Sequence, residues 1–257
     1  MLENPFKIRF YFLLVVYGML VLLDAWFLYK GQYNLRVITK LTALPLLGIW
    51  FYANTSSKKL VAPNTFQARF IIYIALILLF VSDKLSLNYE NLICYEACLI
   101  LYTFIYLAYI FLVINLQKSI SLEEKYLVYL KLWLPAFILM TVFSLFFLRR
   151  IIDDWWIFYE VMVGIHAFVI ILLFSVVMNA FGEKEMRPIW MYLVAAVFFL
   201  LLANVSYGIS DLIYFRRHRI LDVPVAIGNG LSQALMFFAV IKFVLLKWET
   251  NEISLDN

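Results

Sequence analysis

The chain has 257 residues, of which 65% are hydrophobic and 15% are charged, and its formal net charge is +4. Soluble domains are about half apolar and a quarter charged, so this composition predicts an integral membrane protein. The basic residues are dispersed along the chain, which argues against a protein that binds nucleic acid.

Apolar runs of about 20 residues, the length needed to cross a bilayer, follow one another along the chain. Lys7 and Arg9 precede the first run, which continues to Tyr29 without a small-residue cleavage site and therefore indicates a membrane span rather than a signal peptide. The connections between runs are short and polar. The sequence predicts an all-α fold, a polytopic membrane helical bundle in one domain over residues 1–257, with eight transmembrane helices at 9–29, 37–54, 66–84, 91–115, 126–148, 156–181, 188–214 and 223–246.

An even number of spans places both termini on the same side of the membrane. Lys and Arg are slightly more numerous on that side, so the positive-inside rule predicts that the termini are cytoplasmic. We expect the protein to reside in the inner membrane of a bacterium.

Two of the predicted spans end in the same dipeptide, Ser82-Asp83 and Ser210-Asp211, although a helix C-terminus is unfavourable for a carboxylate. Both spans end on the side opposite the termini, so both aspartates fall near one membrane face. Ionisable groups at membrane depth usually face the bundle interior or a wet cavity. We therefore expect one polar pocket open toward that face. Other polar residues expected within about 5–15 Å of it are Asp24, Lys40, Glu96, Glu160, His166, Asn229 and Gln233.

Simpler roles compete with each of these assignments. An aspartate at a helix end can reach interfacial water, Lys40 can extend to the headgroups, and His166 can be a hydrogen-bonded core residue. Two carboxylates in one low-dielectric pocket do not both ionise readily, however, and a protonated acid beside an ionised partner suits acid–base hydrolysis. The two histidines, His166 and His218, are too few for a three-histidine zinc site, so we expect no metal and no cofactor.

Four segments carry a family resemblance: TKLTALPLL (39–47), LLFVSDKLSL (78–87), ANVSYGISDLIYF (203–215) and VPVAIGNGLSQALMF (223–237). They resemble motifs in the second, third, seventh and last spans of the lysoplasmalogenase (YhhN-like) family of multi-span membrane proteins. The resemblance implies a hydrolase that cleaves the vinyl ether bond of a lysoplasmalogen, a membrane lipid substrate, and releases a fatty aldehyde. Asp83 and Asp211 would then be its catalytic carboxylates. The candidates for substrate binding or support are Lys40, Asp24, Ser82, Ser210, Asn204, Asn229, Gln233, Glu96 and His166.

Two other classes of function stay open. One is a proton- or cation-coupled transporter, and the other is a non-catalytic lipid-binding membrane protein. A transport path should show polar groups through to the opposite face or broken helices at the midplane. The gathering of polar residues near one face therefore favours the hydrolase.

Overall fold

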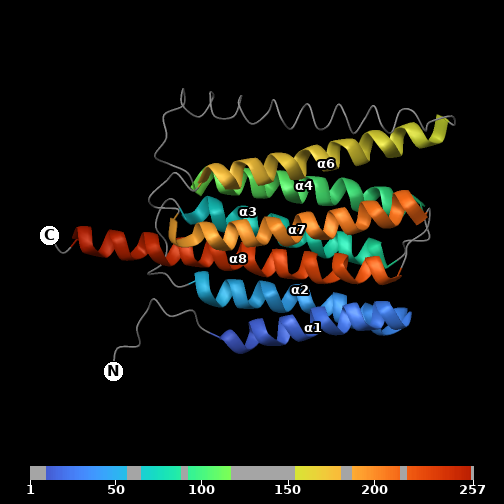
Figure 1. Ribbon diagram of the computed structural model, residues 1–257. Coiled ribbons are helices and arrows are strands. Elements are labelled where there is room, and N and C mark those ends of the chain that lie inside the picture. The colour runs from blue at the N-terminus through green and yellow to red at the C-terminus, as the bar shows by residue number, and fades with distance from the viewer. Residues whose placement is uncertain are drawn as a thin grey trace. The chain divides into compact units, whose positions relative to one another are not determined.

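The computed structural model describes residues 10–56, 65–87, 92–116, 154–180, 187–214 and 219–255. Within these ranges, the side chains of 92–93, 95, 154–160, 210–214, 219 and 247–255 are not described. Every regular element in the described ranges is an α-helix (Figure 1). The helices are α1 (Tyr11–Lys30), α2 (Tyr33–Thr55), α3 (Thr65–Ser86), α4 (Leu92–Leu116), α6 (Asp154–Ala180), α7 (Arg187–Tyr214) and α8 (Arg219–Leu255).

The helices confirm the predicted all-α membrane bundle. Seven of them, counted over the described residues, are long and apolar enough to cross a membrane. The predicted span 126–148 lies outside those residues. Most helix ends fall close to the predicted ones, but α8 continues to Leu255, well beyond the predicted end at 246. The apolar run ends at 246, whereas a helix that has left the hydrocarbon region can continue with polar residues.

The outer surface of α1 is suited to lipid. Side chains three or four residues apart on one of its faces each expose between 51% and 61% of their surface, although all are large and apolar: Phe12, Val15, Met19, Leu22 and Trp26. In a water-soluble protein such a stripe would be buried against other elements. Hydrocarbon chains solvate it instead, so the chain is an integral membrane protein.

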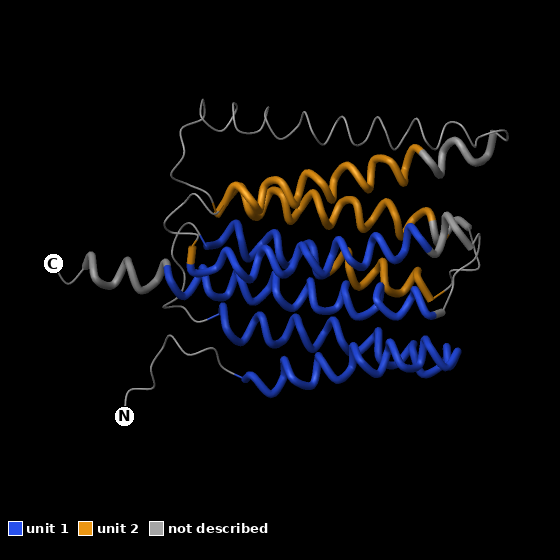
Figure 2. The backbone as a smooth tube through the Cα atoms, viewed as in Figure 1, with its two compact units in different colours: residues 1–76, 188–257 blue, residues 77–187 orange. Residues whose placement is uncertain are grey.

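The chain divides into two compact units (Figure 2). Unit 1 consists of residues 1–76 and 188–257 and contains α1, α2, α7, α8 and the N-terminal half of α3. Unit 2 consists of residues 77–187 and contains the C-terminal half of α3 with α4 and α6.

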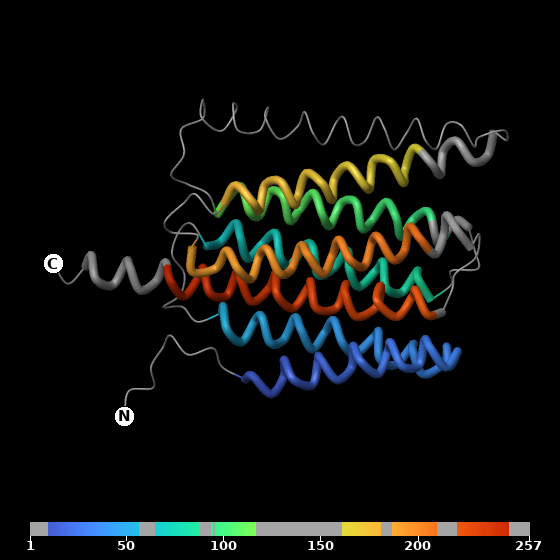
Figure 3. Tube along the Cα trace, viewed as in Figure 1, coloured from blue at the N-terminus to red at the C-terminus, as the bar shows by residue number. Residues whose placement is uncertain are grey.

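In unit 1, α1, α2 and α8 pack against one another. A tight turn joins the first two helices, and the chain can be followed through it in Figure 3. Gly31 adopts the left-handed conformation with φ 71°, and the N–H groups of Gly31 and Gln32 donate to the carbonyls of Leu28 and Phe27 at 3.1 and 2.8 Å. A glycine in this position ends a helix and satisfies its last carbonyls. Because the turn is so short, α2 begins at Tyr33 and returns alongside α1.

Aromatic side chains fill the interior of unit 1. Trp50 of α2 stacks on Phe238 of α8, with 6.2 Å between ring centroids. The neighbouring Phe51 meets Phe237 of α8 at 5.4 Å and Tyr73 of α3 at 5.5 Å, both edge to face. Trp50, Phe51 and Phe237 are fully buried. These rings tie α2, α3 and α8 into one core.

Gly228 allows α8 to lie directly against α7. A Cβ added at Gly228 would lie 2.7 Å from the Phe199 carbonyl oxygen and 3.0 Å from the Ala203 Cβ. We expect Gly228→Ala to force the two helices apart, at a cost of about 1–3 kcal/mol in unfolding free energy. Gly208→Ala in α7 is the matched control, because a Cβ there meets nothing within 4 Å. Thermal unfolding in detergent compares the two variants, and equal Tm values would contradict the prediction.

In unit 2, α4 packs against α6. The fully buried apolar side chains of these helices include Ile105, Leu112 and Val113 of α4 with Leu173 and Val177 of α6. The end of α3 joins this pair through Cys98 of α4, whose Sγ donates to the Ser82 carbonyl at 3.2 Å. This contact sets the position of the turn of α3 that carries Asp83.

Candidate functional site

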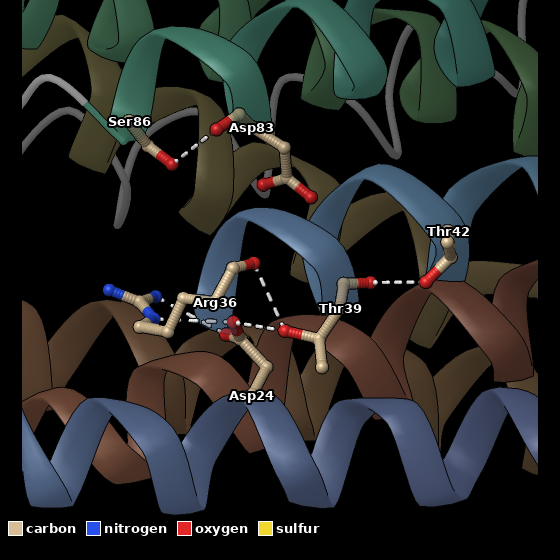
Figure 4. Close-up of polar contacts among 6 residues, drawn as sticks. All are labelled: Asp24, Arg36, Thr39, Thr42, Asp83 and Ser86. Carbon is tan, nitrogen blue, oxygen red and sulfur yellow. Dashed lines mark hydrogen bonds and ion pairs between the residues drawn. The ribbon is translucent and has the colours of Figure 1, made fainter. Parts of the chain in front are cut away.

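A charged cluster in unit 1 connects α1 with α2 (Figure 4). Arg36 holds Asp24 with two hydrogen bonds, Nε to Oδ1 and Nη2 to Oδ2, each 3.2 Å long. The Thr39 hydroxyl lies 3.0 Å from Asp24 Oδ1 and 3.0 Å from the Arg36 carbonyl oxygen. All three residues are buried, with 7% or less of their surface exposed. The cluster therefore places a charge pair inside the helical hairpin.

The geometry of this cluster favours a structural role for Asp24. A bidentate arginine–carboxylate pair is a strong, oriented interaction. It neutralises the Asp24 charge and occupies both carboxylate oxygens, which makes Asp24 a poor donor or acceptor of protons for a substrate. Lys40, one of the predicted substrate-binding or supporting residues, is half-buried one turn beyond Arg36.

Tyr17 connects α1 with the predicted polar segment of α8. Its hydroxyl donates to the Gly230 carbonyl at 3.0 Å and lies 3.4 Å from Gln233 Oε1. Two neighbouring polar atoms of α8, Asn229 Oδ1 and Ser232 Oγ, are buried without a hydrogen-bond partner among the described residues. Gln233 is buried in unit 1, and Asn229 is half-buried with its Oδ1 atom enclosed.

Asp83 is held by a tyrosine in unit 2. The Tyr102 hydroxyl donates to Asp83 Oδ1 at 3.2 Å, and both residues are half-buried. Ser86 Oγ donates to the Asp83 carbonyl at 2.8 Å and closes the last turn of α3 (Figure 4). The phenol fixes the orientation of the carboxyl group without bringing a positive charge to it. The Tyr102–Asp83 contact is a hydrogen bond from a neutral group, whereas the Arg36–Asp24 contact is an ion pair.

His166 of α6 packs against the next turn of α4. Its Nδ1 is 2.9 Å from Thr103 Oγ1, and the Tyr106 ring packs beside it with 5.1 Å between centroids. Thr103 Oγ1 also lies 2.8 Å from the Leu99 carbonyl, to which it donates. When the single hydroxyl proton is used in that bond, Nδ1 must be the protonated nitrogen. His166 is 8% exposed, and these contacts fit a hydrogen-bonded core histidine.

The remaining predicted site residues have varied surroundings. Asn204 donates to the Leu200 carbonyl of its own helix at 2.8 Å. Ser82 is fully buried, and its Oγ has no partner among the described residues. Glu96 is half-buried near the start of α4. Asp211 and Ser210 belong to α7 by their backbone, but their side chains lie outside the described ones, as does that of Glu160 in α6.

Asp83 belongs to unit 2 and Asp211 to unit 1. That the two carboxylates share one pocket therefore stays a prediction.

Sequence reasoning missed the residues that hold the aspartates, namely Arg36 and Tyr102. A signal for Arg36 was present, because Asp24 and Arg36 lie on either side of Gly31 at comparable distances along the chain. In an antiparallel helical hairpin, residues equally far from the turn lie at the same height along the two helices. Tyr102 follows Cys98 by four residues and so lies on the same face of α4. No pattern in the sequence distinguishes it from the other tyrosines of that helix.

Comparisons of the chain with protein-family models, with curated proteins and with solved structures find no match. The proposed function therefore rests on the four sequence motifs and on the surroundings of the polar residues.

Proposed function

We propose that this protein is a membrane-embedded hydrolase that cleaves the vinyl ether bond of lysoplasmalogen-like lysophospholipids. The observation that carries the proposal is the bond between Tyr102 and Asp83, which orients a half-buried carboxyl group at the end of a helix of membrane length. Acid–base catalysis needs such a group, held in a fixed position. Asp211 is proposed as the second carboxylate on the strength of its Ser-Asp motif.

The proposed reaction needs only a proton, a water molecule and two carboxyl groups. One aspartic acid donates its proton to the vinyl carbon distant from the ether oxygen, which leaves an oxocarbenium-like cation. The other carboxylate stabilises this charge and takes a proton from the water that attacks the adjacent carbon. The hemiacetal then breaks its C–O bond, and the products are a fatty aldehyde and a glycerophospho-base. As that bond breaks, the hemiacetal hydroxyl returns a proton to the first aspartate, and the second carboxyl group passes the proton it took from water to the leaving oxygen. Both carboxyl groups thus regain their starting states, and the steps balance without a redox partner.

Aldehyde release from purified protein tests the proposal. The protein in detergent is incubated with lysoplasmenyl-ethanolamine in D2O, and the aldehyde is trapped at once as an oxime for mass spectrometry. We expect one deuterium at the carbon next to the carbonyl, because the acid protonates that position. The saturated alkyl-ether analogue is the control substrate and should yield no aldehyde.

A double variant, Asp83→Asn with Asp211→Asn, locates the activity. It should release no aldehyde while keeping the elution volume and the Tm of the wild type. Aldehyde release at the wild-type rate would contradict the assignment of the carboxylates. No aldehyde from folded wild-type protein would contradict the hydrolase itself and leave the transporter and the lipid-binding protein as the alternatives.

We also propose an inner-membrane location in a bacterium with cytoplasmic termini, supported by the distribution of Lys and Arg between the two sides. Fusions at the C-terminus test the orientation. A fluorescent protein that matures in the cytoplasm should be bright there, whereas an alkaline phosphatase that needs the periplasm should be inactive. The reverse result would overturn the proposed topology.

A further inference from the structure

The contacts between α2 and α3 in unit 1 define an antiparallel register. A Cβ added at Gly48 would lie 2.8 Å from Leu76 Cδ2, and three residues further along α2 the Phe51 ring meets Tyr73, three residues back along α3. Continuing the same register for four more residues, about one helical turn, places Thr55 opposite Arg69. The register thus brings Arg69 and Tyr73 of α3 against the C-terminal end of α2.

Two hydrogen-bond donors in this region have no acceptor. Arg69 Nε and Tyr73 Oη are buried, and neither has a hydrogen-bond partner among the described residues. The two residues are four apart on one helix and therefore neighbours on its surface. Helical side chains lean toward the N-terminus, so the Tyr73 hydroxyl extends toward the level of Arg69. Thr55, on the facing helix, donates its own hydroxyl to the Phe51 carbonyl at 2.9 Å.

The chemistry of the missing partner follows from the donors. A guanidinium can only donate hydrogen bonds and always carries its charge, so its partner is an acceptor and preferably an anion. Arg36, which is buried in the same unit, has such a partner in Asp24. Arg69 has no carboxylate partner within the described part of the chain. Along α2, Arg36 and Thr55 are separated by a rise of about 28 Å. Because Arg69 lies opposite Thr55 in this register, Arg36 and Arg69 lie near opposite ends of the unit.

We propose that Arg69 and Tyr73 form a binding site for phosphate oxygens at the α2–α3 end of unit 1. A phospholipid headgroup and free inorganic phosphate present the same oxygens, and the end of two membrane-length helices is reached by headgroups from the bilayer and by ions from water. The site is independent of the proposed hydrolase chemistry, because it uses neither Asp83 nor Asp211.

Binding to delipidated full-length protein tests the site. One arm titrates phosphatidylglycerol and follows the bound lipid by native mass spectrometry, and the other arm titrates inorganic phosphate by calorimetry. Arg69→Gln should weaken binding of the anion about tenfold, the effect of one charge-assisted hydrogen bond, and Tyr73→Phe about threefold. The matched controls are Lys30→Gln, which also removes one positive charge, and Tyr52→Phe, which removes an exposed hydroxyl. Both controls should bind as the wild type does.

The two arms separate the sources of the phosphate. Dependence of phosphatidylglycerol binding on Arg69 and Tyr73 supports a headgroup site, and dependence of inorganic phosphate binding alone supports a site for the free ion. Equal binding of both ligands by wild type, Arg69→Gln and Tyr73→Phe would overturn the proposal. If Arg69→Gln fails to fold, Arg69→Lys replaces it, because the lysine keeps the charge but loses the Nε donor and should still bind less tightly than the wild type.

Discussion

Replacing Asp83 by asparagine is expected to lower kcat for vinyl ether hydrolysis about 10³-fold, the usual contribution of a positioned general acid or base. Asparagine has nearly the same shape as aspartate and can still accept the bond that Tyr102 donates at 3.2 Å. It can neither deliver a proton at neutral pH nor carry the negative charge that stabilises a cation. The loss should therefore appear in kcat, with little change in Tm, and initial rates of aldehyde release measure it.

Tyr102→Phe separates the positioning of Asp83 from its chemistry. The variant keeps an aromatic ring beside Tyr106, 6.2 Å away between centroids, and removes only the hydroxyl. We expect kcat to fall about tenfold, as for one hydrogen bond to a carboxylate, with KM unchanged. Tyr52→Phe, at a tyrosine that exposes 59% of its surface, is the control for a lost hydroxyl. Wild-type kcat in both Asp83→Asn and Tyr102→Phe would remove unit 2 from the proposed active site.

Loss of either partner of the Asp24–Arg36 pair should be the largest destabilisation in unit 1. The side chains of Arg36 and Asp24 are only 6% and 10% exposed. Asp24→Asn leaves a buried guanidinium without a counter-charge, which costs about 3–5 kcal/mol. We expect a fall in Tm of about 10 °C in detergent, because that free energy corresponds to a few degrees per kcal/mol in a chain of this size. Arg36→Gln should cost less, because an unpaired carboxyl can neutralise itself by protonation whereas a guanidinium cannot.

The double variant Asp24→Asn with Arg36→Gln supplies the control. Both replacements are uncharged amides that can bond to each other, so much of the lost stability should return. Thermal unfolding of the wild type, the two single variants and the double variant forms a double-mutant cycle, which measures the coupling between the two side chains. Additive losses in the double variant would show that the two side chains do not stabilise the hairpin through each other.

Asp24 and Asp83 show that the depth of a residue in the membrane does not determine which side chains it contacts. The sequence placed both near one membrane face, and it could do so because each residue adds a fixed rise along a helix. Depth is only one of three coordinates. The position around the helix and the choice of neighbouring helix are set by packing, which gives Asp24 an arginine from α2 and Asp83 a tyrosine from α4. The two carboxylates therefore have different partners although the sequence predicts a similar depth for both.

The spans themselves could be predicted from the sequence alone. A bilayer requires about 20 apolar residues and leaves no water for unpaired backbone groups, so hydropathy and length suffice to find α1 to α4 and α6 to α8. Only the tertiary structure decided which polar side chains meet. Contacts such as Tyr17 with Gly230, or Phe51 with Tyr73, join segments whose side-chain pairing depends on helix rotation and register. Hydrophobicity does not specify either quantity, because lipid accepts any apolar face of a helix and close packing selects the one that turns inward.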